Sequence, residues 1–252
     1  MFDEAMLAEY KTWHWDQVRT GDLDPMYPWL TEFGAMLDLT PDEHASLTLT
    51  YLVYYRIDSA YHAWLQAGRS IPVEPRKYPT ATERRSLRHP DAMMAHLDSL
   101  NEHVAGRPHD WLTGAGSWEA MTDRVMRVHG NGRWAAYKAC DLAVNVHEAP
   151  WRAPDAGHAH STGPRKGLGL LGVPDPGSNT PEAIRALDAA TEALAGMIGE
   201  SDISRVETSL CDFYSHKQGR HPLGHDVIAL ATQVRGIPKG PAAFRKAGLS
   251  AQ

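Results

Sequence analysis

The sequence of 252 residues is poor in cysteine and contains no long hydrophobic run. Its two cysteines, Cys140 and Cys211, cannot build a disulfide framework and fit a reducing compartment. No stretch approaches the roughly 18 apolar residues of a membrane-spanning helix. The N-terminus is acidic, whereas a secretory signal would be basic and then apolar. We therefore expect a soluble protein of the cytoplasm (host cytoplasm if a phage encodes the chain) and no membrane partner.

Several motifs of phosphate and metal chemistry are also missing. No Gly-x-x-x-x-Gly-Lys-Ser/Thr loop is present, which excludes a P-loop kinase, and no dinucleotide fingerprint follows a strand. There is no Cys-x-x-Cys and no His-Glu-x-x-His among the 14 histidines. His216, His221 and His225 gather near the C-terminus without such a motif. On these grounds we predict no metal site.

Basic residues are scarce in the first 50 residues, where Lys11 and Arg19 stand against ten carboxylates. That segment carries a net charge of −8. Because the whole chain carries −6, the remaining 202 residues carry a net charge of +2. Basic clusters follow at Arg76, Lys77, Arg84, Arg85 and Arg88, at Arg152, Arg165 and Lys166, and at Arg235, Lys239, Arg245 and Lys246. They are either solvated faces or phosphate contacts. The total charge argues against a protein that coats DNA non-specifically, but it allows an enzyme with a local basic track.

Strand-like alternation is absent and helical spacing recurs, which predicts an all-α fold. We predict a single helical domain over residues 1–252. It comprises N-terminal helices in 1–66, central helices in 80–147, a long Pro/Gly-rich loop at 148–180 and C-terminal helices in 181–252. In the central part we predict helices at about 90–104 and about 133–147 and a loop at 106–116. A connection as long as this loop is often functional.

Two glycines one residue apart, Gly130 and Gly132, separate two predicted helices. They allow a tight turn that exposes backbone N–H groups at a helix start, where a phosphate can bind; a plain turn is the alternative. In the helix that follows, Lys138 and Asp141 share one face. They are either an exposed ion pair of little energetic value or a lysine placed on a substrate phosphate beside a carboxylate.

A polar stripe marks the helix predicted at residues 202–216. Glu207, Cys211 and Tyr214 fall on one face at positions where a core helix would carry Leu, Ile or Val. The stripe predicts that this face of the helix lines a reactive site. Cys211 is either a thiol nucleophile or a small buried apolar residue.

Arg56 lies among aromatic residues in a helix that we predict to run from Pro41 to about Gln66. A guanidinium is costly to bury without an anionic partner. That partner is either an Asp or Glu of the chain or the phosphate of a ligand, which Arg binds through two parallel hydrogen bonds.

Two motifs, taken in this order, are similar to those of a known family. They are Gly132-Arg133-Trp134-Ala135-Ala136-Tyr137-Lys138-x-x-Asp141 and Glu207-x-x-Leu210-Cys211-x-x-Tyr214. They resemble the phage alpha-glutamyl/putrescinyl thymine pyrophosphorylases, also described as amino acid:DNA transferases. That family is all-helical and distantly similar to helix-hairpin-helix DNA glycosylases, which implies such an architecture here. Trp134 stands where lyase-type glycosylases carry a lysine, which favours the transferase branch.

The resemblance implies a reaction on DNA that contains modified thymine. A separate kinase would activate 5-hydroxymethyluracil as a pyrophosphate ester, and an amine from an amino acid or polyamine would displace pyrophosphate. The base must first be flipped out of the helix. No cofactor is required, although a divalent cation such as Mg²⁺ is compatible with the pyrophosphate.

The resemblance and the residue patterns together assign roles. The predicted catalytic residues are Glu207, Asp141 and Lys138, and the predicted substrate- or phosphate-binding residues are Arg56, Arg133, Trp134, Tyr55, Cys211, Tyr214, Gly130 and Gly132. The alternatives are a DNA glycosylase that acts on a modified base and a non-catalytic, helical DNA-binding accessory module of a base-modification kinase.

Overall fold

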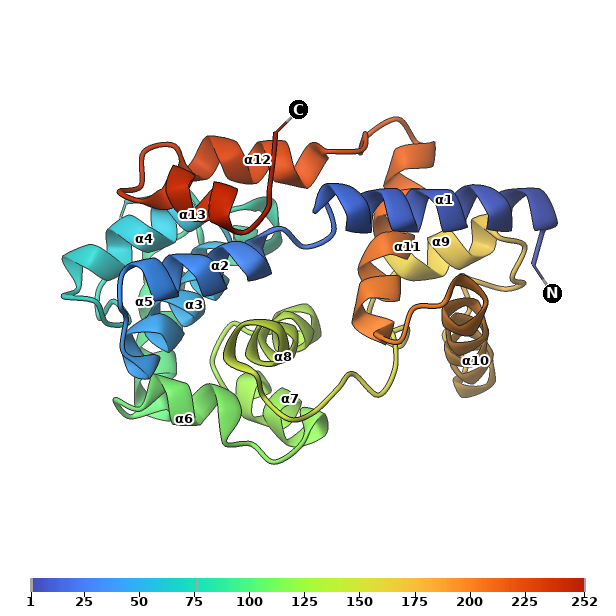
Figure 1. Cartoon of the computed structure of the whole chain (residues 1–252). Coiled ribbons are helices and arrows are strands. Elements are labelled where there is room, and N and C mark those ends of the chain that lie inside the picture. Colours follow the sequence, from blue (N-terminus) through green and yellow to red (C-terminus); the bar gives the residue numbers. More distant parts are fainter. Residues whose placement is uncertain (1, 76, 252) are drawn as a thin grey trace. The chain divides into compact units, whose positions relative to one another are not determined.

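A computed structural model describes residues 2–75 and 77–251 of the chain (Figure 1). The described residues contain helices and no strand, which confirms the all-α class. Among them, no helix has the length and apolarity needed to cross a membrane. Arg76, a member of the first basic cluster, lies outside the described residues.

The elements follow one another along the chain as a series of α-helices with one 3₁₀ helix. They are α1 (Glu4–Thr20), α2 (Met26–Met36), α3 (Pro41–Tyr54), α4 (Ile57–Gln66), η1 (Thr82–Leu87), α5 (Pro90–Val104), α6 (Pro108–Thr113), α7 (Trp118–Met126), α8 (Arg133–His147), α9 (Gly163–Leu170), α10 (Pro181–Ile198), α11 (Ile203–Lys217), α12 (His225–Val234) and α13 (Gly240–Lys246).

The fold consists of two compact units, and each is discontinuous in sequence. Unit 1 contains the described residues up to 25, residues 152–228 and the described residues from 249 onward. Unit 2 contains residues 26–151 and 229–248. Each unit therefore needs segments from distant parts of the chain to complete its core.

The core of unit 1 is formed by α1, α9, α10 and α11. Helix α1 begins where the Asp3 side chain accepts the backbone N–H of Met6 at 2.9 Å. Its residue Tyr10 is fully buried and meets the ring of Phe213 edge-on, with ring centroids 5.4 Å apart. Trp13 also belongs to this core, and its other members are aliphatic: Leu168, Leu171, Val173, Leu187, Ala190, Leu194, Ala195, Ile198, Val206 and Leu210.

The core of unit 2 is centred on α3, in which every residue from Ala45 to Tyr54 is buried. The helix starts with a capping box, because Thr40 Oγ1 accepts the N–H of Glu43 at 3.2 Å while Glu43 accepts that of Thr40 at 2.9 Å. The C-terminal segment joins this unit through α13 and α2. The buried indole of Trp29 donates to the carbonyl of Gly240 at 3.1 Å.

The helix predicted to run from Pro41 to about Gln66 is in fact two helices, so that prediction is wrong. Helix α3 ends at Tyr54 because Tyr55 adopts the left-handed region, with φ of 51°, and its N–H returns to the Tyr51 carbonyl at 2.6 Å. The next residue, Arg56, is extended and precedes α4. The reversal lets α3 and α4 pack against each other.

Two predicted loops also contain helices. Helix α6 lies in the stretch 106–116, and α9 lies in the Pro/Gly-rich loop 148–180. Helix α9 is held by packing on α11: a Cβ placed on Gly167 would lie only 2.4 Å from the Leu210 carbonyl oxygen. Its buried Arg165 fastens the rest of the loop by donating to the Pro176 carbonyl and to Asn179 Oδ1, both at 2.8 Å. From residue 152 onward the segment is therefore a packed part of unit 1.

Candidate functional site

The Lys138–Asp141 pair lies on α8 and is buried, so its interpretation as an exposed ion pair is wrong. The side chains of Lys138 and Asp141 are only 11% and 2% exposed. Lys138 Nζ lies 3.2 Å from Asp141 Oδ2 and donates to the Tyr27 hydroxyl at 2.5 Å. The Tyr27 hydroxyl donates to Asp141 Oδ2, and Asn145 Nδ2 donates to Asp141 Oδ1 at 2.9 Å.

This arrangement gives the members of the cluster different chemical capacities. Both oxygens of Asp141 accept hydrogen bonds, so the carboxylate holds its neighbours in place. The Tyr27 hydroxyl bridges the two charged groups, because it accepts a hydrogen bond from Lys138 and donates one to Asp141. Lys138 brings a positive charge into a site with little water, where its effect on a bound anion is stronger than at the surface. The cluster can therefore stabilise negative charge on a substrate.

The Gly130–Gly132 turn leads directly into the N-terminus of α8. Gly130 has φ of +78°, a backbone conformation that favours glycine. Gly132 is the N-cap residue of α8 and has no side chain with which to cap the helix. Asn131 is held from the side by Arg84 of η1, whose terminal nitrogen donates to Asn131 Oδ1 at 3.1 Å. The same nitrogen lies 3.2 Å from His96 Nε2.

Arg84 was predicted only as a member of the first basic cluster, and its burial could not be predicted from the sequence. It is only 3% exposed, and its hydrogen-bond partners are neutral groups. Burial lowers the pKa of Arg84 to about 10, so that it stays charged at neutral pH. Burial, and then the charge of Arg84, lowers the pKa of His96 to about 4. The buried charge of Arg84 and the N-terminus of α8 thus lie at the same turn, and both favour the binding of an anion there.

The aromatic candidates Trp134 and Tyr55 are brought together. Trp134, in the first turn of α8, is 38% exposed and meets the Tyr55 ring edge-on with centroids 4.7 Å apart. Arg56, in contrast, has its anionic partner within the chain: its Nε and Nη2 donate to the Asp58 carboxylate at 3.1 and 2.6 Å. The sequence left two partners open for Arg56, an acidic residue of the chain or a ligand phosphate. The structure shows the first of these, an ion pair with Asp58.

A basic cavity of about 350 Å³ lies on the same unit. Its lining includes Arg107, Arg124, Arg127 and His103, with one carboxylate, Asp110. Arg124 is tied to the structure by donation to backbone carbonyls, which leaves the exposed Arg107 and Arg127 on the rim.

The polar stripe of α11 belongs to unit 1, and α9 packs on it. The contacts pair Glu207 with Ser161, Cys211 with Gly163 and Tyr214 with Lys166. The Ser161 hydroxyl donates to Glu207 Oε1 at 3.3 Å, and Lys166 Nζ lies 5.2 Å from the centre of the Tyr214 ring. This packing explains why the stripe is not aliphatic. The predicted catalytic and binding roles of Glu207, Cys211 and Tyr214 stay predictions.

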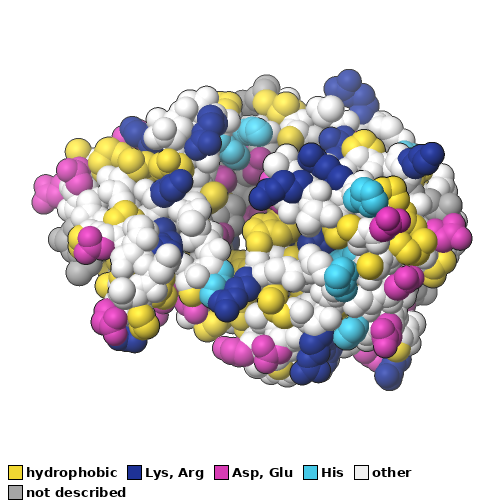
Figure 2. Space-filling view, turned by 180° about the vertical axis from the view of Figure 1, so that it is seen from behind, with side chains coloured by type: hydrophobic (Ala, Val, Ile, Leu, Met, Phe, Trp, Pro, Cys, Tyr) yellow, Lys and Arg dark blue, Asp and Glu magenta, His cyan; other side chains and the backbone are white. Residues whose placement is uncertain are grey.

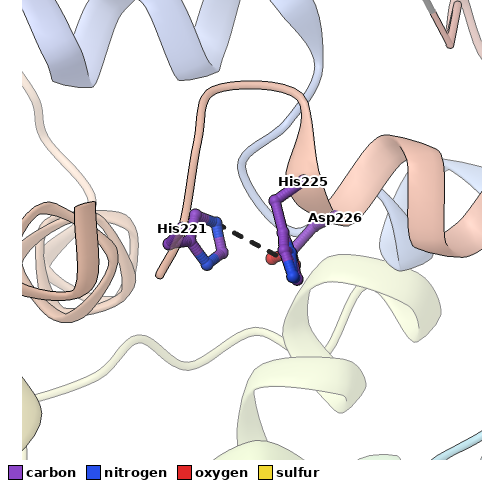
Figure 3. Close-up of side chains that lie close together, drawn as sticks. All are labelled: His221, His225 and Asp226. Carbon is purple, nitrogen blue, oxygen red and sulfur yellow. Dashed lines mark ion pairs between the residues drawn. The ribbon is translucent and has the colours of Figure 1, made fainter. Parts of the chain in front are cut away.

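A second polar cluster in unit 1 was not predicted as a group. The side chains of His221, His225 and Asp226 point toward one another at the start of α12 (Figure 3), with one ligand atom of each within 4.8 Å of the others. The carboxylate of Asp212 lies 3.8 Å from His221 Nε2. Burial, and then His225, lowers the pKa of His221 to about 4, whereas burial, and then Asp226, raises the pKa of Asp212 well above its usual range. The spacing His-x-x-x-His-Asp was the available signal.

The predicted site residues thus fall into two groups, one in each unit. Unit 2 holds Lys138, Asp141, Arg133, Trp134, Tyr55, Arg56, Gly130 and Gly132, and unit 1 holds Glu207, Cys211 and Tyr214.

Together, the fold and these clusters define an all-helical protein with a buried lysine–tyrosine–aspartate cluster, whose lysine and aspartate lie on the helix after the Gly130–Gly132 turn. The family model of the amino acid:DNA transferases matches residues 35–221, and the chain belongs to this family. The family name describes a transferase that acts on DNA. Lys138, Asp141 and Glu207 lie within the matched range, whereas Tyr27, His225 and Asp226 lie outside it.

Proposed function

We propose that the protein attaches an amine, taken from an amino acid or polyamine, to the 5-methylene carbon of pyrophosphorylated 5-hydroxymethyluracil in DNA. The amine nitrogen forms a C–N bond, the C–O bond to pyrophosphate breaks, and the pyrophosphate leaves with that electron pair. The nitrogen then gives a proton to a base. Because the substrate is an activated ester, a separate 5-hydroxymethyluracil kinase has to precede this enzyme.

The observation that carries the proposal is the buried Lys138–Tyr27–Asp141 cluster, in which Lys138 and Asp141 lie on the helix that follows the glycine turn and Tyr27 lies on α2. The reaction places growing negative charge on the leaving pyrophosphate. A pre-positioned cation that is shielded from water stabilises such charge best. We assign this role to Lys138, with Asp141 and Tyr27 as positioning residues.

The turn before α8 supports the same assignment. The buried charge of Arg84, the exposed Arg133 and the N–H groups of the first helical turn all favour a phosphate. We propose that the turn holds a phosphate of the DNA or of the activated base. Trp134 and Tyr55, which lie in contact beside it, offer the aromatic surface on which a flipped base would stack.

The surface charges favour a local contact with DNA. On the face shown in Figure 2, Lys and Arg side chains are interspersed with Asp and Glu rather than forming one uniformly basic surface. With a net charge of −6, binding would depend on limited basic regions such as the cavity rim with Arg107 and Arg127.

The amine must lose a proton, and two carboxylates were predicted for this step. Because the Asp141 carboxylate is buried in its ion pair with Lys138, whereas Glu207 is only half-buried, we propose Glu207 as the base. Glu207→Gln would then slow the transfer and shift its pH dependence. An unchanged rate in this variant would remove the role from Glu207 and leave the rest of the proposal standing.

The test incubates the protein with DNA that contains pyrophosphorylated 5-hydroxymethyluracil and a panel of amino acids and polyamines, followed by digestion and mass spectrometry of the nucleosides. We expect a new nucleoside and released pyrophosphate. Lys138→Met should lower the rate by about 10²–10³-fold, as for the loss of one preorganised donor. The matched control is Lys246→Met, because Lys246 is an exposed lysine of the same unit, 2.8 Å from Glu32.

Three outcomes would contradict the proposal. Abasic sites without amine incorporation would indicate a DNA glycosylase, and DNA binding without any product would indicate an accessory module. Wild-type activity in Lys138→Met would exclude the cluster from catalysis. Circular dichroism and thermal unfolding establish that each variant is folded, and Lys138→Arg, which keeps the charge, should retain more activity than Lys138→Met.

A further inference from the structure

The cluster at the start of α12 has a donor set that is common in metalloproteins, namely two imidazoles and one carboxylate. His221 Nε2 and Asp226 Oδ1 are 4.0 Å apart, and His225 Nδ1 and Asp226 Oδ1 are 3.7 Å apart. Metal–ligand bonds of 2.0–2.2 Å at a tetrahedral ion place neighbouring donors roughly 3.4 Å apart. All three donor atoms lie within 4.8 Å of one another, and the two imidazole rings are stacked with centroids 4.5 Å apart. Binding one ion therefore requires the side chains to rotate so that the donor atoms approach one another by up to about 1.4 Å.

The two imidazole nitrogens are an independent sign of a missing ligand. His221 Nε2 and His225 Nδ1 are both buried, and neither has a hydrogen-bond partner among the described residues. A buried polar atom without a partner is costly, so it calls for an explanation. Both atoms lie within 4.0 Å of Asp226 Oδ1, and His221 faces the other two side chains (Figure 3).

The backbone that carries these side chains is fixed by Asp22, which is fully buried in unit 1. Its carboxylate accepts the N–H groups of Gly224, Asp226 and Val227 at 2.7, 2.9 and 3.0 Å. The first turn of α12 is thereby held in one conformation. A preorganised backbone lowers the cost of gathering ligands around an ion.

A further carboxylate borders the cluster from α11. Asp212 Oδ2 lies 3.8 Å from His221 Nε2 and is held by Gln17 Nε2 at 2.9 Å. Carboxylates next to ligating histidines orient metal ligands and tune the metal. The side chains of His225 and Asp226 are 41% and 38% exposed, so the site is open to solvent on one side.

From this geometry we infer that His221, His225 and Asp226 bind one divalent transition-metal ion of the Zn²⁺ class, with Asp212 as an outer carboxylate. Imidazole nitrogens select against Mg²⁺ and Ca²⁺, which prefer oxygen ligands. Three protein ligands leave a coordination position for water or an anion. The inference concerns residues outside the Lys138 cluster and holds whether or not the proposed transfer is correct.

The test uses the full chain without a histidine tag, stripped with EDTA and then titrated with Co²⁺, Zn²⁺ or Mg²⁺. We expect one Co²⁺ or Zn²⁺ per chain, no comparable binding of Mg²⁺, and a rise in the melting temperature with the bound ion. The Co²⁺ spectrum should show d–d bands without a thiolate charge-transfer band, because the ligand set has no cysteine.

Matched variants locate the site. His221→Ala and Asp226→Asn should each weaken Co²⁺ binding by at least about tenfold. The control is His89→Ala, because His89 also lies near an aspartate (3.6 Å from Asp91) but is exposed. Metal content near zero after reconstitution, a thiolate band, or wild-type affinity in the folded variants would overturn the inference. If the variants do not fold, the Co²⁺ stoichiometry and spectrum of the unmodified chain decide it.

Discussion

At the scale of single residues, Tyr27 shows how one hydroxyl group organises a charged pair. It donates to Asp141 and accepts from Lys138, and Lys138 Nζ also lies 5.0 Å from the centre of its ring. The spacing of Lys138 and Asp141 correctly predicted a shared helix face. Their burial was not predictable from that spacing, because it depends on a residue 111 positions earlier in the chain.

Replacing Tyr27 by Phe should destabilise the protein by about 1–3 kcal/mol, because the buried Asp141 carboxylate loses one of its hydrogen-bond donors. The midpoint of urea unfolding measures this change. The transfer rate should fall as well, since Lys138 loses its hydrogen bond to the Tyr27 hydroxyl. Tyr78→Phe is the matched control: Tyr78 accepts a hydrogen bond from Gln66 near the surface, and its loss should cost no more than about 0.5 kcal/mol. Equal stability of the two variants would mean that the Tyr27 hydroxyl is not part of the cluster.

At the scale of elements, helices with a proline in the first turn or with regular apolar spacing were predicted well, and helices rich in glycine were not. The helices Pro90–Val104 and Arg133–His147 match their predicted bounds, because Pro90 opens the first and regular apolar spacing marks the second. Helix α9 has three glycines in eight residues, which local propensity assigns to a loop. Packing against α11 overrides that propensity.

Gly167→Ala tests this explanation. The added Cβ would lie 2.4 Å from the Leu210 carbonyl oxygen and 3.0 Å from its carbon, so the two helices must move apart. We expect a destabilisation of about 1–3 kcal/mol, typical of overpacking, measured by thermal or urea unfolding. The matched control is Gly196→Ala within α10, where the new Cβ meets nothing within 4 Å. That change should stabilise the protein by roughly 0.5–1 kcal/mol. A stabilising effect of Gly167→Ala would show that α9 and α11 do not approach each other closely enough to exclude a Cβ at this position.

At the scale of the whole molecule, composition and periodicity predicted the helical class but not how the chain is divided. Unit 2 combines residues 26–151 with 229–248, and no local signal marks segments that pair over such a distance. The arrangement of the histidine cluster also depends on a contact between distant parts of the chain, so it could not be predicted from the sequence. Its ligands are neighbours in sequence, but Asp22, which fixes their backbone, lies about 200 residues earlier.

The division predicts that residues 26–151 do not fold without residues 229–248. The C-terminal segment contributes the buried side chains of Val234, Ile237 and Phe244, and Gly240 accepts the indole N–H of Trp29. Each buried side chain of this kind contributes about 1.5–3 kcal/mol, so together they approach the 5–15 kcal/mol that stabilises a typical domain.

Circular dichroism of the 26–151 fragment should therefore show little helix and no cooperative melting. Co-expression with the 229–248 segment should restore both. The control is the same segment with Val234→Asp and Ile237→Asp, which should fail because it cannot bury its apolar face. A fragment that melts cooperatively by itself would mean that α2–α8 form a complete core. In that case the C-terminal helices would only cover this core, and the boundary between the two units would have to be drawn elsewhere.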